Sequence, residues 1–271
     1  MTELTPNPWV EFYPSNPEEA MRMAKPRKIS LAVATALALG LALPAYAQHG
    51  GDGYLFHAPN VRFSLRGGYD HANANSELFD QAVKDLSLNK SDFSGLTLGT
   101  EIAFALGSRV DLSLDVGYSR AQKGSDFRHF EDNNNLPIEQ TTTFQRVPVM
   151  GNLRFYLSPP GRTVGRLAWI PSKVVPWVGA GAGTMWYRFE QAGDFVDFQT
   201  SNVFTSTFQS SGWTPAVQGM GGVDISITPL LALRGEGRYV WAKAPLGRDF
   251  SGFNRIDLSG VQGTLGLTFR L

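Results

Sequence analysis

From about residue 61 onward, apolar and polar residues alternate along the chain. In segment 110–118, valine, leucine and tyrosine occupy the even positions, whereas aspartate, serine and glycine occupy the odd ones. Because successive side chains of a β-strand point to opposite faces, this pattern predicts strands with one apolar and one polar face. We find no convincing helical period after residue 60. Eight such segments can be distinguished, at about 61–69, 96–106, 110–118, 147–157, 175–189, 213–227, 231–241 and 261–271.

The connections between these segments alternate in length. Tight turns follow the second and sixth segments, and long polar stretches follow the first, third, fifth and seventh, at about 70–92, 120–142, 190–212 and 242–255. Alternating long loops and short turns are typical of a transmembrane β-barrel. The stretch 158–173 breaks the pattern, because it is too long for a tight turn. We expect its apolar residues, Leu167, Trp169 and Ile170, to lie at the inner membrane–water interface.

The polar faces carry charges of both signs. Ten residues form this candidate interior network: Arg62, Arg66, Glu101, Asp111, Asp115, Arg154, Asp224, Arg234, Glu236 and Arg238. Opposite charges inside a closed barrel can pair, and an eight-stranded barrel has an interior about filled by its own side chains. We therefore expect a closed or very narrow lumen. Aromatic residues at the strand ends suit a membrane-interface girdle. A soluble β-sandwich is the alternative, because its strands alternate in the same way.

The chain begins with features of an export signal. A basic stretch, 25–28, precedes the apolar run 29–43, and the small residues Ala45 and Ala47 follow. These are the three parts of a secretory signal peptide, with cleavage expected before Gln48. A transmembrane anchor is the alternative, but the run is shorter than the ~20 residues that span a bilayer. We therefore expect an amino-terminal extension and signal over 1–47, a periplasmic tail over 48–60, and a barrel over 61–271.

The final strand and the features above resemble a known family. In the ending Gly-Leu-Thr-Phe-Arg-Leu, apolar residues recur at every second position, at Leu265, Leu267, Phe269 and Leu271. Together with the signal peptide and the eight segments, this ending resembles the small bacterial outer-membrane β-barrel proteins, which include OmpA-like, OmpW-like and opacity-type barrels. The resemblance implies an eight-stranded antiparallel up-and-down transmembrane barrel with both termini in the periplasm. It also implies that the last strand is recognised by the barrel-assembly machinery. The family usually ends in Phe, whereas this chain ends in Leu.

Composition excludes several classes of function. The 24 basic and 24 acidic side chains balance, so the chain lacks the basic surplus of a general nucleic-acid binder. With no cysteine, it can form neither a disulfide nor a thiolate site. The run Gly179–Gly183 lacks the lysine and the spacing of a phosphate-binding loop. We therefore predict no cofactor and no nucleic-acid partner.

The predicted external loops contain reactive residue types without a fixed arrangement. The stretch 125–132 holds Ser, Asp, His and Glu, but on a loop rich in asparagine, so a solvated loop is the favoured interpretation. The phenylalanines of 195–208 could contact a ligand, although an extended hairpin is the preferred interpretation. Three functional hypotheses remain. A structural or surface-interaction barrel is favoured over a narrow channel for small or apolar solutes and over a lipid-modifying enzyme. Expected partners are outer-membrane lipid and lipopolysaccharide, and an extracellular ligand at the loops is conceivable.

Overall fold

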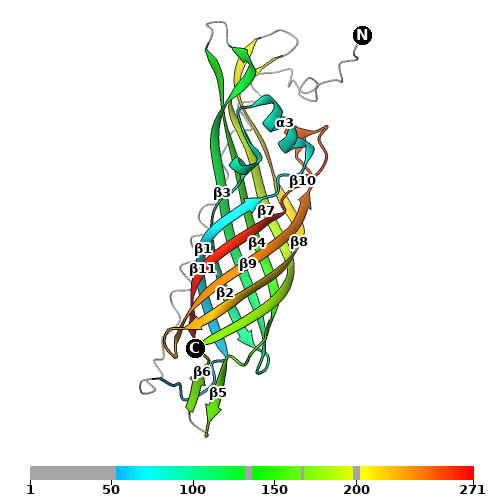
Figure 1. Ribbon diagram of the computed structural model, residues 1–271. Helices are drawn as coiled ribbons and strands as arrows, with labels where there is room; N and C mark the ends of the chain where they lie inside the picture. The colour runs from blue at the N-terminus through cyan, green and yellow to red at the C-terminus, as the bar shows by residue number, and fades with distance from the viewer. Residues whose placement is uncertain (1–52, 132–135, 166–167, 198–201) are drawn as a thin grey trace. The chain divides into compact units, whose positions relative to one another are not determined.

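The computed structural model describes residues 53–131, 136–165, 168–197 and 202–271. The chain divides into two units, Met1–His49 and Gly50–Leu271, and the first, with the predicted cleavage site, lies outside the described residues. The elements of the second unit are labelled in Figure 1 where there is room. In chain order they are β1 (Val61–Ala72), α3 (Glu77–Asp85), η3 (Lys90–Phe93), β2 (Gly95–Ala105), β3 (Val110–Glu131), β4 (Pro137–Tyr156), β5 (Gly161–Val164), β6 (Ala168–Pro171), β7 (Val174–Val196), β8 (Val203–Ser226), β9 (Leu231–Ala244), η4 (Arg248–Phe250), β10 (Ile256–Asp257) and β11 (Gly260–Arg270).

Eight of the strands close into a barrel (Figure 1). The sheet follows the order β11-β1-β2-β3-β4-β7-β8-β9, and β9 pairs with β11 to complete the ring, while the two-residue β10 pairs only with β9. All these pairings are antiparallel, and the first strand, β1, pairs with the last, β11, where the ring closes. At the closure, the Leu271 N–H donates to the Val61 carbonyl at 2.9 Å, and the Val61 N–H donates back at 3.2 Å. The predicted eight-stranded up-and-down barrel is confirmed.

Burial in this barrel is the reverse of that in a soluble protein. The most exposed large side chains on its wall include Leu96, Leu98 and Leu265, at 76%, 65% and 67% exposure, whereas charged residues point inward and are buried. A β-sandwich would bury its apolar faces between two sheets, so that alternative is wrong. A continuous apolar outer wall around a closed ring is the arrangement that a lipid bilayer requires of β-strands. No helix among the described residues is long and apolar enough to cross a membrane.

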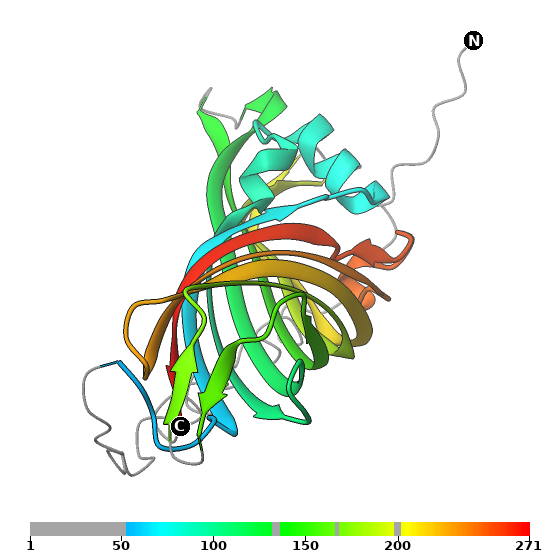
Figure 2. The same cartoon turned by 60° about the horizontal axis from the view of Figure 1, so that its bottom comes forward.

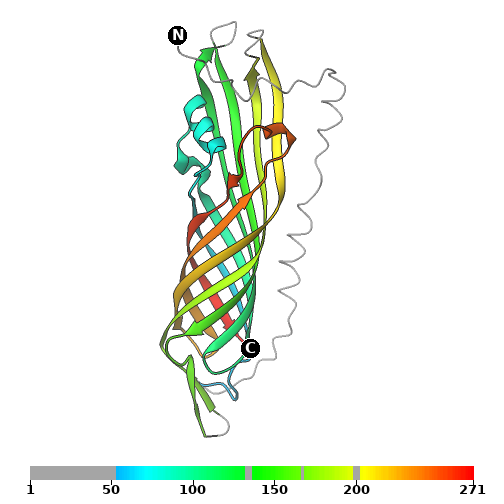
Figure 3. The ribbon, with the colours of Figure 1, turned by 90° about the vertical axis from the view of Figure 1, so that its right-hand side faces the viewer.

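Four strands continue beyond the barrel wall at one end (Figure 3). We call this the loop end and call the opposite end, where Val61 and Leu271 meet, the turn end. At the loop end β3 pairs with β4 as far as Glu131, and β7 pairs with β8 as far as Val196. The predicted long loops over 120–142 and 190–212 are therefore largely wrong, and the preferred hairpin is confirmed at Phe195, which pairs with Phe204. The alternation of apolar and polar residues, which predicts strands elsewhere in the chain, disappears in these extensions. It does so because their outer face no longer meets lipid.

The expectation that no helix follows residue 60 is also wrong. The connection after β1 forms α3, which buries Leu78, Phe79 and Ala82 and exposes its charged side chains. Its nine residues make only two and a half turns, so the helical period is too short to stand out in the sequence. The short 3₁₀ helices η3 and η4 each bury one phenylalanine, Phe93 and Phe250.

The stretch 158–173 forms a hairpin of its own at the turn end (Figure 2). Strands β5 and β6 pair with each other and not with the barrel sheet. The side chain of Trp169 is buried, its backbone pairs with Leu55, and its ring lies 5.7 Å from the Arg270 guanidinium. Trp169 therefore faces a buried cation and not lipid headgroups, and the interfacial position of Ile170 stays a prediction. Leu167 lies outside the described residues.

The apolar wall leads to a direct test. Leu114 faces outward in the middle of the alternating segment 110–118, opposite Ile102 and Gly151. Leu114→Arg should lower the free energy of unfolding by ~2–4 kcal/mol, because the charge would sit near the bilayer midplane. Urea titration in phospholipid vesicles measures this change. The matched control is Leu136→Arg at the exposed tip of the β3–β4 hairpin, which should change stability by less than ~0.5 kcal/mol. Equal effects of the two substitutions would argue against a lipid-facing wall.

Candidate functional site

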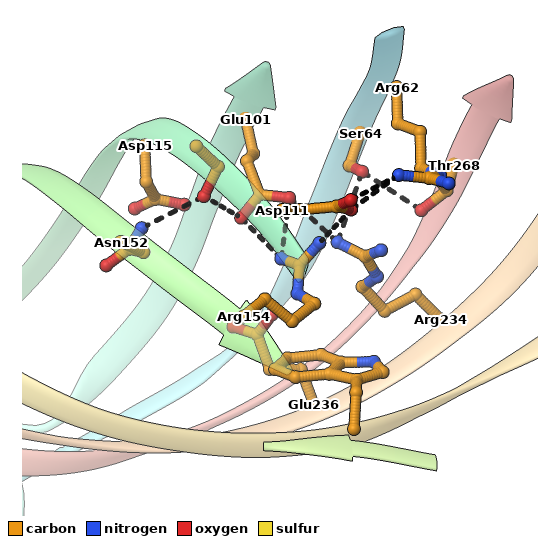
Figure 4. Close-up of polar contacts among 12 residues, drawn as sticks. Arg62, Ser64, Glu101, Asp111, Asp115, Asn152, Arg154, Arg234, Glu236 and Thr268 are labelled. Carbon is orange, nitrogen blue, oxygen red and sulfur yellow. Dashed lines mark hydrogen bonds and ion pairs between the residues drawn. The ribbon is translucent and has the colours of Figure 1, made fainter. Parts of the chain in front are cut away.

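The ten predicted interior charges all lie in the barrel lumen, and Figure 4 shows the part of this set around Glu101 and Arg154. They come from six of the eight barrel strands and have exposures between 0% and 8%. Each arginine and each carboxylate forms an ion pair with another member of the set. Five cations therefore meet five anions. Because an unpaired buried charge would be very unfavourable, this balance is what allows the set to be buried at all.

Glu101 on β2 lies between two arginines from other parts of the wall. Nη2 of Arg154 donates to both carboxylate oxygens, at 2.7 and 2.6 Å, and Nη1 of Arg234 donates at 2.8 Å. The hydroxyl of Ser113 adds a fourth hydrogen bond at 3.2 Å. The carboxylate thus joins β2 to β4 and β9, so side-chain contacts cross the lumen as well as following the wall.

Arg234 extends this group toward β8. Its Nε and Nη2 donate to the two oxygens of Asp224 at 2.7 and 2.9 Å, a paired geometry that suits a guanidinium and a carboxylate. The indole N–H of Trp177 donates to the same carboxylate at 3.2 Å. The Trp177 ring also lies under Arg154, 4.4 Å from the guanidinium carbon. This buried tryptophan therefore contacts both arginines and the Asp224 carboxylate.

Arg62 and Asp111 form another ion pair beside Arg154, at the turn end of the lumen. Its Nη1 lies 2.6 Å from both oxygens of Asp111, and the Tyr156 hydroxyl donates to the same carboxylate at 2.6 Å. Nη1 of Arg154 is 4.0 Å from Asp111, which connects this pair to Glu101. We call these six charged residues the turn-side cluster: Arg62, Glu101, Asp111, Arg154, Asp224 and Arg234.

The remaining four charges form a loop-side cluster: Arg66, Asp115, Glu236 and Arg238. Asp115 accepts from Nη2 of Arg66 at 2.8 Å and from Nη1 of Arg238 at 3.1 Å. Glu236 pairs with Arg238, whose Nε donates at 2.8 Å. Each carboxylate is thus held by a guanidinium, and β1, β3 and β9 are joined across the lumen.

A chain of neutral groups connects the two clusters. Arg238 donates to Gln218 at 3.4 Å, Gln218 donates to Asn152 at 2.6 Å, and Asn152 donates to Ser113, which contacts Glu101. The polar interior is therefore one connected network. Such a network favours one arrangement of the wall strands, because a shift of register would break several contacts together.

The glycine run of β7 makes room for this network. The sequence leaves the faces of this strand unassigned, and the structure places its odd-numbered residues inward. A Cβ on Gly181 would lie 1.9 Å from Oδ1 of Asn152 and 2.7 Å from the Gly151 carbonyl oxygen. Any side chain there would displace the amide that joins the two clusters. The glycines thus serve close packing inside the barrel, as glycine in a strand often does.

One interior ion pair lies just beyond the predicted strand ends. Arg146 on β4 lies 2.8 Å from Asp70 on β1, and both side chains are buried. Arg146 also donates to the Leu258 carbonyl at 2.9 Å. The expected loop 70–92 includes Asp70, and Arg146 precedes the expected fourth strand by one residue. Continuing the even-numbered polar face of either strand by one step would have found them.

An aromatic cap closes the lumen at the loop end. Five phenylalanines meet above the ion pairs, and two of them belong to wall strands: Phe79, Phe93, Phe144, Phe189 and Phe250. The Phe79 ring lies 4.6 Å from Phe93, 5.4 Å from Phe144 and 5.8 Å from Phe189. Because α3, η3 and η4 each contribute one ring, the connections after β1 and β9 fold over the barrel mouth and cover it.

The solvated loop expected over 125–132 is wrong for its described residues, which belong to a strand as far as Glu131. Ser125 and Asp126 lie in β3 and not on a loop, and the Ser125 side chain is buried. The side chain of His129 is outside the described structure. Across the described ranges, no group of three His, Asp or Glu side chains is placed to hold a metal ion. Leu265, Leu267, Phe269 and Leu271 all face outward, and their recognition by the assembly machinery stays a prediction.

Comparison with known proteins gives structural similarities alone. No family model matches the chain, and a search of characterised proteins finds no match. Among solved structures, Neisserial surface protein A is similar with 10% identity, a TM-score of 0.42, and coverage of 78% of this chain and 96% of its own. A major outer membrane protein of Thermus thermophilus has 11% identity, a TM-score of 0.41, and coverage of 79% and 100%. Outer membrane protein W of E. coli has 14% identity, a TM-score of 0.37, and the same coverage. Similarity at this level gives no information on function.

The ion-pair network predicts a large cost for removing one charge. Glu101→Gln keeps the shape of the side chain but leaves Arg154 and Arg234 without their shared anion. The free energy of unfolding should fall by ~3–5 kcal/mol, as for other buried pairs that lose one partner. The control is Asp80→Asn, which breaks the exposed pair with Lys90 and should cost less than ~1 kcal/mol. A loss below ~1 kcal/mol for Glu101→Gln would show that the network is not paired as described.

Proposed function

We propose that this protein is a closed barrel of the bacterial outer membrane with a structural or surface-interaction role and no enzymatic activity. The single observation that supports a closed barrel is the paired network of ten charges across the lumen. A solute crossing the barrel would have to separate contacts of 2.6–2.8 Å between buried ions. The aromatic cap adds an apolar layer above them.

The asymmetry of the two ends supports an orientation. The loop end carries α3 and the long β3–β4 and β7–β8 hairpins, whereas the turn end carries two tight turns and the β5–β6 hairpin. In outer-membrane barrels the longer connections lie outside the cell and the short turns lie in the periplasm. We therefore propose that both chain termini face the periplasm after removal of the signal peptide. The loop end would then be the surface that meets lipopolysaccharide and any extracellular partner.

A narrow channel is the second candidate. It is favoured by a few buried polar atoms that have no hydrogen-bond partner among the described residues, namely Nε and Nη1 of Arg154 and Oε2 of Glu236. Ordered water commonly occupies such positions. Isolated waters between ion pairs do not form a path, however, because the ion pairs and the aromatic cap still cross the lumen.

Planar-bilayer recordings distinguish these two candidates. Purified barrel whose folding has been verified by heat-modifiable gel migration should produce no conductance steps at neutral pH, because the ion pairs and the aromatic rings leave no continuous path. The heat-denatured protein in the same detergent is the control for background events. Reproducible single-channel steps from the folded sample alone would contradict the closed barrel and support the channel.

A further inference from the structure

The exposed charges of the barrel are distributed unequally between its ends. Three basic residues are exposed at the turn end, Arg109 in the β2–β3 turn, Arg162 on β5 and Lys173 before β7. The described residues of this end include no exposed acidic side chain. At the loop end, by contrast, exposed acidic and basic residues are mixed, as in the Asp80–Lys90 pair. The turn end is therefore a basic surface.

Two of the basic residues, Arg109 and Lys173, lie on the same side of the turn end. The Arg109 carbonyl accepts a hydrogen bond from the Tyr156 N–H at the end of β4, and the Lys173 carbonyl accepts one from Ser226. Arg109 precedes β3 and Lys173 precedes β7, and β4 lies between these two strands. Two strand spacings separate their backbones by roughly 10 Å. Arg162 lies on the hairpin between β4 and β7, which projects from the turn end (Figure 2).

The basic surface adjoins the apolar wall without a gap. Leu106, Leu157 and Val174 are about half to two-thirds exposed, and they lie beside Arg109, the β5–β6 hairpin and Lys173 along the chain. Apolar side chains that face acyl chains thus give way directly to cations at the depth of the lipid headgroups. Arginine and lysine suit this depth, because their stems can lie along apolar surface while the charge reaches the headgroups.

We propose that Arg109, Arg162 and Lys173 form a binding surface for anionic phospholipids at the turn end. The partner needs both a phosphodiester, which pairs with the cations, and acyl chains, which cover the adjoining leucines. Phosphatidylglycerol has both features and is the probe of choice. The proposed orientation puts this surface in the inner leaflet of the outer membrane. The preference for anionic lipid does not depend on that orientation. Near a membrane surface each basic residue favours anionic lipid by roughly fivefold.

Native mass spectrometry of the folded full-length protein tests this proposal. In micelles containing equal amounts of phosphatidylglycerol and phosphatidylcholine, the wild type should retain the anionic lipid in at least a tenfold excess. The triple variant Arg109→Gln, Arg162→Gln and Lys173→Gln should reduce this excess to about twofold or less. The control variant changes three exposed lysines of the loop end, and it should keep the wild-type ratio: Lys84→Gln, Lys90→Gln and Lys243→Gln.

Three outcomes would overturn the proposal. The first is an unchanged lipid ratio in the turn-end variant, with folding verified by heat-modifiable migration. The second is the same loss in the loop-end control. The third is displacement of the lipid by free inorganic phosphate, which would show a site for the anion alone. These lipid-binding measurements are independent of the conductance recordings. Rejection of the lipid-binding surface can therefore be distinguished from rejection of the closed barrel.

Discussion

The pairing of charges inside a lipid-facing wall is the constraint on which the rest of this barrel depends. The outer face is apolar because it meets acyl chains, so the polar residues of every strand point into a space that eight strands make narrow. Glu101 there joins Arg154 and Arg234, which belong to opposite regions of the wall. If the Glu101 carboxylate lost these partners, it would remain buried as an unpaired charge, which is strongly destabilising. The network therefore fixes the register of the strands and closes the lumen together.

Other features of the interior follow from this network. Trp177 contacts two guanidinium groups, and Gly181 leaves space for the Asn152 amide that links the clusters. Aromatic rings fill the loop end, and Trp169 covers Arg270 at the turn end. The lumen is thus filled in layers, with ion pairs between two aromatic closures. This filling of the lumen is the basis of the proposed closed barrel.

The wall and its charges could be predicted from sequence because a strand has a period of two. Each residue between Val110 and Tyr118 is assigned to lipid or lumen by its parity alone. The prediction was wrong where no lipid faces the strands and apolar and polar residues need not alternate, as in the loop-end parts of β3 and β7. It also missed α3, whose nine residues bury Phe79 only because the barrel mouth lies beneath it. The Asp70–Arg146 pair was missed because the expected first strand ended one residue too early and the expected fourth strand began one residue too late.

Cysteine labelling tests the closed, oriented barrel most directly, because the chain has no cysteine of its own. Single cysteines replace Asp80 at the loop end, Thr163 at the turn end and buried Ser113 in the lumen, and cells are treated with a membrane-impermeant maleimide. Asp80→Cys should react on intact cells, and Thr163→Cys only after the outer membrane is permeabilised. Ser113→Cys should stay unlabelled in both conditions until the barrel is unfolded. Labelling of Ser113→Cys in the folded barrel as fast as that of Asp80→Cys would contradict the account.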